Sequence, residues 1–233
     1  MSSIYLIRHG QASFGQENYD QLSELGQRQA SRLGEVVGSR LGSINRVVLG
    51  TMHRHRQTAE NCLIGFGLDL GSVDTEFDAG WNEYDHQDIL AQFRPEFATA
   101  AGMTEFIRQQ PNPKQAFEQD FNAAMNRWIA GEHDDYVESW HDYRARVQQA
   151  LARTVERHAA STRTLVFTSG GPISLVSQQL LGVPSEAIMR MNWTLMNCAV
   201  TKLVSTKDRL FLSSLNEHSH FEGDAFKHFI TYT

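Results

Sequence analysis

The 233-residue sequence contains only two cysteines, Cys62 and Cys198, which lie far apart and show no Cys-x-x-Cys spacing. This excludes a disulfide framework and a zinc ribbon, and it favours reduced thiols in a cytoplasmic protein. Long hydrophobic runs are also missing, because the first apolar run, residues 4–7, ends at Arg8 and no later run approaches membrane-spanning length. The sequence therefore predicts neither a signal-peptide core nor a transmembrane helix.

Positive charge is scarce as well. The chain has 21 Lys and Arg against 27 Asp and Glu, a formal net charge of -6, and no basic run. An acidic protein of this kind is poorly suited to nucleic acid or to anionic membranes, and we expect neither as a partner. An anionic ligand would have to be held by a local cluster of cations. The sequence predicts no particular oligomeric state.

Short apolar runs alternate with segments of helical periodicity along much of the chain. Strands are predicted near residues 4–7, 46–50, 164–168, 199–204 and 210–215. Helices are predicted near residues 26–41, 56–63, 116–129, 140–155 and 173–181. This alternation predicts an α/β fold, a three-layer α/β/α sandwich with a mostly parallel central sheet.

One stretch departs from the alternation. Residues 84–137 are rich in Gln, Phe, Ala and acidic residues, are punctuated by Pro95, Pro111 and Pro113, and contain a helical stripe but no strand-like run. We interpret the stretch as a helical insertion that lies over the active site. The chain is then a single α/β domain spanning residues 1–233.

Three polar segments directly follow predicted strands or strand-like runs. They are Arg8-His9-Gly10, residues 51–54 and Ser169-Gly170-Gly171. In sheets of parallel strands the carboxyl ends lie at one edge, where ligands bind. We therefore expect these three segments to meet in one site.

Several of these motifs resemble those of a known family. Residues 6–11, Leu-Ile-Arg-His-Gly-Gln, resemble the Arg-His-Gly signature of the histidine phosphatase superfamily, which includes the cofactor-dependent phosphoglycerate mutases. Residues 22–30 resemble the segment that leads into the first helix of that family, and residues 54–60 resemble its second-arginine motif. Residues 81–83, Trp-Asn-Glu, stand where the family has its acidic residue. The order and spacing agree over nearly the whole chain.

The resemblance implies a role for each matched residue. His9 would be the nucleophile that forms a phosphohistidine, splitting a difficult hydrolysis into two easier steps. Arg8 and Arg54 would bind the phosphoryl oxygens, since a guanidinium makes paired, charge-assisted hydrogen bonds. Glu83 would protonate the leaving oxygen and then help to deprotonate water. Neither a metal nor another cofactor is expected, and the partner would be a small phosphorylated substrate.

Some assignments have competitors nearby in the sequence. Arg56 could be confused with Arg54, although the Gln-Thr-Ala context favours Arg54. The acid could instead be one of the acidic residues near Glu83, namely Glu76, Asp78 or Asp85. Histidine pairs at 53/55 and 218/220 could suggest a metal site, but such pairs without cysteine or carboxylate support are typical of a surface.

Ser169 is the main departure from the family pattern. Residues 166–171 resemble the segment that carries the second histidine of the family, and Ser169 stands in its place. We expect the Ser169 hydroxyl and the Gly170 amide to bind phosphate, because amides at a helix start attract anions. Histidines elsewhere could stand in for the missing one: 53, 55, 86, 218 and 220. Replacing Ser169 with histidine is predicted to raise turnover, provided that the ring has room.

The predicted function is hydrolysis of a phosphate monoester through a phosphohistidine on His9. A phosphoglycerate mutase is the nearest alternative, but residues 11–15 lack the Trp-Asn and Thr-Gly-Trp patterns expected of the mutases. A phospho-ligand binding or regulatory module with weak or lost catalysis is the second alternative, and Ser169 is the residue that suggests it.

Overall fold

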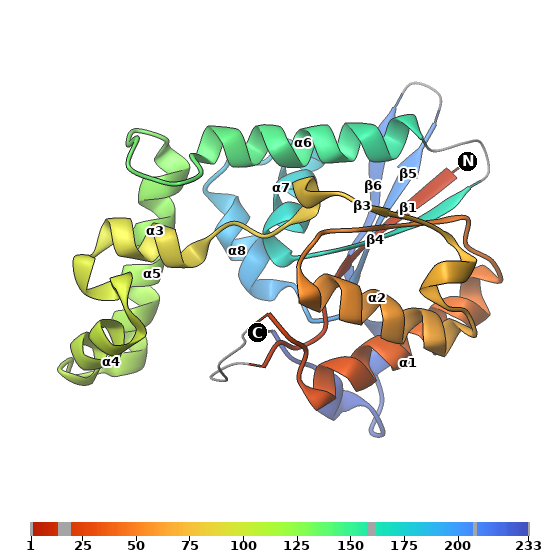
Figure 1. The fold of residues 1–233 in the computed structure, drawn as a ribbon, viewed down its shortest axis with the longest axis horizontal. Coiled ribbons are helices and arrows are strands. Elements are labelled where there is room, and N and C mark those ends of the chain that lie inside the picture. The colour runs from red at the N-terminus through yellow and green to blue at the C-terminus, as the bar shows by residue number, and fades with distance from the viewer. Residues whose placement is uncertain (1, 14–19, 158–161, 207–208, 233) are drawn as a thin grey trace.

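The computed structural model describes residues 2–13, 20–157, 162–206 and 209–232. Within these residues, six strands form one sheet in the order β3-β2-β4-β1-β5-β6 (Figure 1). The parallel part consists of β1 (Ser2–Arg8), β2 (Arg46–Leu49), β3 (Asp74–Phe77) and β4 (Arg163–Thr168). The last two strands, β5 (Val200–Ser205) and β6 (Leu210–Glu217), run antiparallel to their neighbours. The prediction of an α/β fold with a mostly parallel sheet is confirmed.

The central strands form where the sequence has short, continuous apolar runs. Such runs are typical of parallel strands that are buried on both faces. Side chains alternate between the faces, so Leu6 of β1 and Val166 of β4 enter one core while Ile7 and Phe167 enter the other. All four of these side chains are fully buried.

Helices cover both faces of the sheet and give the predicted three layers. One face is covered by α1 (Glu24–Leu41) and α2 (His53–Phe66), and the other by α6 (Trp140–Glu156), α7 (Gly170–Leu181) and α8 (Ala187–Thr194) (Figure 1). The two helices of the first layer pack closely, because a β-carbon on Gly34 of α1 would lie 1.9 Å from the carbonyl oxygen of Cys62 in α2. This packing fixes the position of α2, whose first turn lies at the site.

The predicted helical insertion is present between β3 and α6. It contains α3 (His86–Phe93), α4 (Ala100–Arg108) and α5 (Pro113–Ala130), which extend from the sandwich beside the carboxyl ends of the parallel strands (Figure 1). Trp128 of α5 joins the insertion to the body, since its ring centroid lies 5.3 Å from those of Tyr84 and Tyr143. Aromatic contacts of this kind fix the insertion relative to the site.

The structure differs from the sequence prediction in three elements. β3 was not predicted, because it is an edge strand whose residues are half-buried or exposed and therefore carry no apolar run. α8 was not predicted either. α2 begins at His53, earlier than predicted, and its first turn has polar residues that hide the helical periodicity. No helix in the described part of the chain combines the length and apolar character needed to cross a bilayer.

Candidate active site

The carboxyl ends of the parallel strands bring the three predicted segments together. β1 and β4 pair in register up to Arg8 and Thr168, and the His9 amide donates to the Thr168 carbonyl oxygen at 2.9 Å. β2 pairs with the other side of β4, with Leu49 opposite Phe167. The residues that follow these strands therefore start side by side at one edge of the sheet.

His9 is buried at the centre of this edge, with 5% of its surface exposed. Its Nδ1 lies 2.8 Å from the carbonyl oxygen of Gly10. A carbonyl oxygen can only accept, so Nδ1 carries the hydrogen and Nε2 of the neutral ring keeps its lone pair. Burial is the main cause that holds the pKa of His9 well below its usual value, and the charges of Arg54 and Arg8 lower it further. The imidazole is thus kept neutral, as a nucleophile requires.

The backbone that follows His9 is held by contacts with α1 and α2. A β-carbon on Gly10 would lie 2.5 Å from the carbonyl oxygen of Gly26 at the start of α1, so only glycine allows this approach. The Gly10 amide donates to Thr58 Oγ1 of α2 at 3.1 Å, and the Gln11 amide donates to Gln29 Oε1 of α1 at 2.8 Å. These bonds hold the backbone that fixes the His9 tautomer.

Arg8 and Arg54 both lie near His9. Each lowers the pKa of the imidazole through its charge, and each also acts on Glu83. Arg8 donates from Nη1 to the carbonyl oxygen of Leu195, which follows α8. Arg54, 5% exposed in the first turn of α2, donates from Nη1 to Asp20 Oδ1 at 2.9 Å. Two guanidinium groups anchored in this way suit a doubly charged phosphoryl group.

The sequence competitor of Arg54 lies outside the site. Arg56 is exposed on α2 and pairs with Glu60 one turn later, at 2.8 Å. The assignment of the site arginine to position 54 therefore agrees with where the two side chains lie.

Glu83 lies against the start of α7. Its Oε2 accepts from the Gly171 amide at 3.1 Å. A β-carbon on Gly171 would lie 2.1 Å from Glu83 Oε1 and 2.6 Å from the Tyr143 hydroxyl oxygen, so this glycine makes room for the carboxyl group. Burial raises the pKa of Glu83, while the Gly171 amide and the charges of Arg54 and Arg8 oppose that rise. A raised pKa suits a carboxyl group that donates a proton.

The three acidic competitors have structural partners elsewhere. Glu76 pairs with Arg46 and Arg157. Asp78 pairs with Arg153 and accepts from the Gly80 amide. Asp85 accepts from backbone amides at the start of α3. Glu83 instead lies close enough to Arg54 and Arg8 for their charges to act on its carboxyl group.

Ser169 begins α7 as its N-cap residue but makes no side-chain capping bond. Its Oγ lies 2.7 Å from Nε2 of His55, and both residues are fully buried. The His55 ring centroid is 5.9 Å from that of His9. Gly170 follows Ser169 and lies beside Arg8, because a β-carbon on it would be 3.6 Å from Arg8 Nε.

The remaining histidines lie differently. His86 is the first residue of α3. Burial lowers its pKa, and the charge of Arg54 lowers it further, so His86 lies near Arg54. His53 is exposed. His218 bonds to the Asn216 carbonyl oxygen in β6, and His220 bonds to the Cys198 carbonyl oxygen, which precedes β5. Among these residues, His55 is the one that the structure places against Ser169.

Sequence reasoning missed some of the surrounding residues. Asp20 holds Arg54, and Asn192 of α8 donates to the Tyr84 hydroxyl at 3.3 Å while lying against Gly170. The Tyr143 hydroxyl faces Gly171 and Glu83. None of these residues follows a predicted strand, so the strand-end argument could not find them. Over the described ranges, no group of three His, Cys, Asp or Glu side chains is placed to hold a metal ion.

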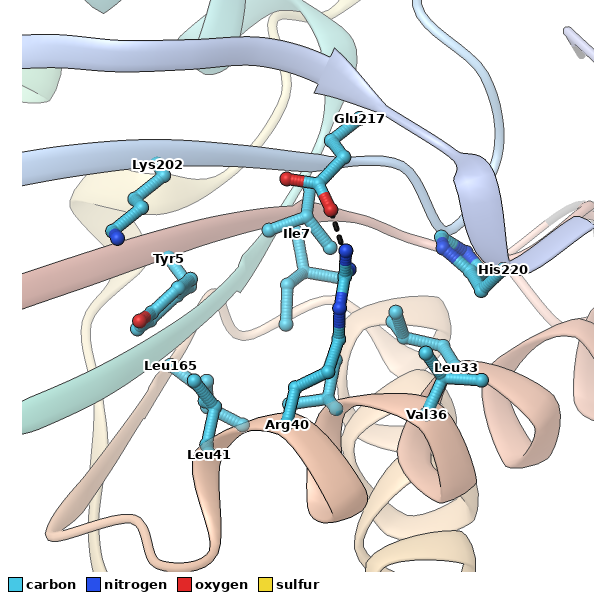
Figure 2. A pocket seen from close by; sticks show the side chains of 12 residues that line it. Tyr5, Ile7, Leu33, Val36, Arg40, Leu41, Leu165, Lys202, Glu217 and His220 are labelled. Atoms are coloured by element: carbon cyan, nitrogen blue, oxygen red, sulfur yellow. Dashed lines mark hydrogen bonds and ion pairs between the residues drawn. The ribbon is translucent and has the colours of Figure 1, made fainter.

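A separate cavity of about 210 Å³ lies between α1 and the sheet (Figure 2). Its walls include Ile7, Leu33 and Leu165, and the ion pair between Arg40 and Glu217 spans it, with 2.5 Å between Nη1 and Oε1. The cavity has no nucleophile with paired arginines around it.

Several solved structures are similar in fold to this chain. YhfR from Bacillus stearothermophilus is 19% identical, with a TM-score of 0.69 over 95% of this chain and 100% of that one. Phosphoserine phosphatase from Entamoeba histolytica, solved with 3-phosphoglyceric acid, is 17% identical, with a TM-score of 0.64 over 94% and 99%. Phosphoglycerate mutase from Bacillus anthracis is 17% identical, with a TM-score of 0.63 over 94% of each chain.

At these identities the solved structures establish a shared fold. No curated protein sequence matches the chain. The family match comes from the sequence itself, which fits the histidine phosphatase superfamily (branch 1) over residues 4–218. The chain belongs to this superfamily.

Proposed function

We propose that the protein hydrolyses a phosphate monoester through a phosphohistidine on His9. The observation that carries the proposal is the state of the His9 ring. Its Nδ1 is tied to the Gly10 carbonyl oxygen at 2.8 Å, which leaves the Nε2 lone pair available beside the guanidinium groups of Arg8 and Arg54. A neutral, oriented imidazole next to two fixed positive charges is suited to attack a phosphorus atom.

In the first step, the phosphoryl oxygens bind Arg8 and Arg54. His9 Nε2 attacks phosphorus in line, the P–N bond forms, and the bond to the ester oxygen breaks. Glu83, in the protonated form that its buried position favours, gives its proton to the leaving oxygen. The products of this step are an alcohol, a phosphohistidine and the Glu83 carboxylate.

In the second step, a water molecule attacks the phosphohistidine. The Glu83 carboxylate takes a proton from the water as the P–O bond forms and the P–N bond breaks. Inorganic phosphate leaves, His9 returns to its neutral state, and Glu83 is again protonated. The arginine charges are present throughout, so the mechanism draws on positioning and electrostatics.

A mutase reaction would use the same first step but return the phosphoryl group to a second hydroxyl. The sequence of residues 11–15 favours the phosphatase, although residues 14 and 15 lie outside the described part of the chain. The similarity in fold to a phosphoglycerate mutase keeps this second candidate in view. Incubation with a phosphoglycerate separates the two, since the phosphatase releases inorganic phosphate and the mutase yields an isomer.

The test of the proposal is to trap the intermediate. Quenching the enzyme during turnover of an aryl phosphate should give a phosphoryl adduct on His9 that is acid-labile and base-stable. His9→Ala should remain folded and form no adduct, because a methyl group cannot attack phosphorus. A phosphoserine in place of the phosphohistidine, or normal turnover by folded His9→Ala, would overturn the proposal. Affinity for phosphate without turnover in the parent would instead indicate a binding module.

A further inference from the structure

The hydrogen bond between His55 and Ser169 differs from the helix-capping bond that a serine usually makes at an N-cap position. A serine at a helix N-cap normally accepts from an amide in the first turn. Ser169 makes no such bond, and its Oγ instead lies 2.7 Å from His55 Nε2. Ser169 follows Thr168, whose carbonyl oxygen accepts from the His9 amide, so this side-chain pair lies next to the nucleophile.

Gly50 makes the room for the His55 ring. A β-carbon at this position would lie 2.2 Å from Nδ1 and 2.8 Å from Cε1 of His55. The ring therefore packs directly on the backbone at the end of β2. Any side chain at position 50 would displace the ring from this position.

The direction of the hydrogen bond follows from the other ring nitrogen. His55 Nδ1 is buried and has no hydrogen-bond partner among the described residues. A hydrogen on Nδ1 would be a buried donor without an acceptor, which costs free energy. With the hydrogen on Nε2, His55 donates to Ser169 Oγ, and the serine hydroxyl is left to donate its own hydrogen elsewhere.

We propose that His55 is a positioning residue that directs the Ser169 hydroxyl as a hydrogen-bond donor toward the phosphoryl group held beside His9. This inference rests on the proposed function, because it needs an anion at His9. The unprotonated oxygens of a phosphoryl group only accept hydrogen bonds, so Ser169 must donate to them and must receive its second bond from a donor. His55 Nε2 is that donor. The pair then supplies a neutral, oriented hydrogen bond from two residues on different elements, α2 and the start of α7.

A serine and a histidine in contact could also act as nucleophile and base. That arrangement needs the base to be oriented by a third group on its other nitrogen. His55 Nδ1 has no such partner in the described residues, whereas the corresponding nitrogen of His9 is held by Gly10. The geometry therefore favours His9 as the nucleophile and gives His55 the supporting role.

The test is a double-mutant cycle between His55→Leu and Ser169→Ala, with His55→Gln as the matched control. His55→Leu fills a similar volume without a donor, and His55→Gln retains an N–H that can reach Ser169. We expect His55→Leu and Ser169→Ala each to lower kcat for an aryl phosphate by about 10-fold or more, since one oriented donor is lost. The double variant should lose no more than either single variant. His55→Gln should stay within about 3-fold of the parent, a difference of less than 1 kcal/mol.

Two further measurements keep a folding defect apart from the proposed role. The Tm of each variant reports its fold, and the affinity for inorganic phosphate, measured by calorimetry, reports the donor even where turnover is too slow. Both His55→Leu and Ser169→Ala should weaken phosphate binding by the same factor. Gly50→Ala should lower kcat more in the parent than in the His55→Ala background, where the ring is absent and only the Asn82 Oδ1 atom, 2.8 Å from such a β-carbon, still has to shift.

Several results would overturn the inference. Independent, multiplicative effects of His55→Leu and Ser169→Ala would show that His55 does not act through Ser169. Equal loss in His55→Gln and His55→Leu would show that the N–H is not what matters. A phosphoserine at position 169 would make the pair a nucleophile and base. Absence of any adduct on His9 in the parent would count against the proposed function, and the phosphate-binding cycle would then decide the role of His55 separately.

Discussion

Asp20 and Arg54 form an ion pair at the edge of the site, with 2.9 Å between Oδ1 and Nη1. The other carboxylate oxygen of Asp20 accepts from the His53 amide at 2.8 Å, in the first turn of α2. Met52, the N-cap residue of that helix, offers no capping side chain. Asp20 thus both caps the helix that carries Arg54 and places a negative charge beside the proposed phosphate site.

Asp20→Asn should tighten phosphate binding. The amide can still accept from the His53 backbone, but it removes a negative charge that opposes an incoming anion. We expect the Kd for inorganic phosphate to fall about 3- to 10-fold at low salt, with a smaller change at high salt, as screening predicts. Isothermal titration at two salt concentrations measures this. Asp20→Ala is the control. It also removes the cap, so its free energy of unfolding should fall by about 1 kcal/mol, which lowers its Tm. Weaker binding in a folded Asp20→Asn protein would mean that Asp20 instead orients Arg54 for the phosphate.

Arg54→Ala and Arg56→Ala should differ sharply although they are two residues apart. Arg54 is buried beside His9, and Arg56 is exposed and paired with Glu60. Loss of the first should cost about 2–4 kcal/mol of transition-state stabilisation, as for removal of one preorganised donor. Arg56→Ala should leave kcat/KM close to that of the parent, because it removes only an exposed ion pair worth about 0.5 kcal/mol or less in stability. Values of kcat/KM for both variants are the measurement, and the reverse ranking would contradict the site assignment.

Much of this site could be predicted from the sequence, because its residues follow short apolar runs that can be recognised locally. The segments containing Arg8, His9 and Arg54 follow apolar runs that are buried on both faces, and such runs are recognisable without a structure. Parallel pairing then brings their ends together. The His55–Ser169 contact could not be predicted in this way, because it joins residues 114 positions apart and depends on the space above Gly50.

The missed elements have a related explanation. β3 is an edge strand, so one of its sides lacks a neighbour and its sequence carries no continuous apolar signal. Asp20 lies outside the strand-end pattern and is recognisable only when α2 is placed beside it. Asn192 lies on α8, and its link to Tyr84 crosses between elements with no shared sequence pattern.

Glu83→Gln should show a dependence on the leaving group. The amide cannot donate a proton to the ester oxygen as a carboxylic acid does, so substrates with poor leaving groups lose the most. We expect kcat/KM for an alkyl phosphate to fall about 100-fold or more, within the range of general acid catalysis, and that for a nitrophenyl phosphate to fall much less. Comparing the two substrates on one protein preparation removes differences in folding. Equal losses for both would remove Glu83 from the role of acid.

His220 should make the stability of the fold depend on pH. Burial lowers its pKa to about 4, and its Nε2 donates to the Cys198 carbonyl oxygen at 3.1 Å. The unfolded chain binds a proton at this residue below its ordinary pKa of about 6.5, and the folded chain resists it. The stability that neutral His220 contributes is therefore fully present above the ordinary pKa of about 6.5, and it is lost as the pH falls toward 4.

Between pH 7 and pH 5, His220 alone should lower the free energy of unfolding by about 2 kcal/mol. Urea unfolding at the two pH values measures the loss. His220→Gln is the matched variant, since its amide can still donate to Cys198 but does not titrate in this range. It should lose less stability than the parent between the two pH values, while His9 and His55, whose pKa values burial also lowers, contribute to both proteins equally. An unchanged pH dependence in His220→Gln would contradict the assignment.

Ser169→His provides a stringent test of how the site is arranged. From sequence alone, the larger and stronger donor is expected to raise turnover wherever the ring has room. The structure does not provide that room, because His55 Nε2 already lies 2.7 Å from Ser169 Oγ and both residues are fully buried. A second imidazole would therefore clash with the first, and overpacking of this kind typically costs about 1–3 kcal/mol. From the structure, we expect Ser169→His alone to have a lower kcat and a lower Tm than the parent.

The double variant Ser169→His/His55→Ala should reverse that loss. Alanine at position 55 opens the space above Gly50, and the new imidazole can then donate to the phosphoryl group directly, without a serine between. We expect its kcat to exceed that of either single variant and its Tm to recover relative to Ser169→His. The measurement is kcat for one aryl phosphate across the four proteins, with Tm as the folding control. If Ser169→His alone is faster than the parent, His55 does not occupy the space that the structure gives it. If the double variant is the slowest of the four, a histidine at position 169 cannot replace the pair formed by Ser169 and His55.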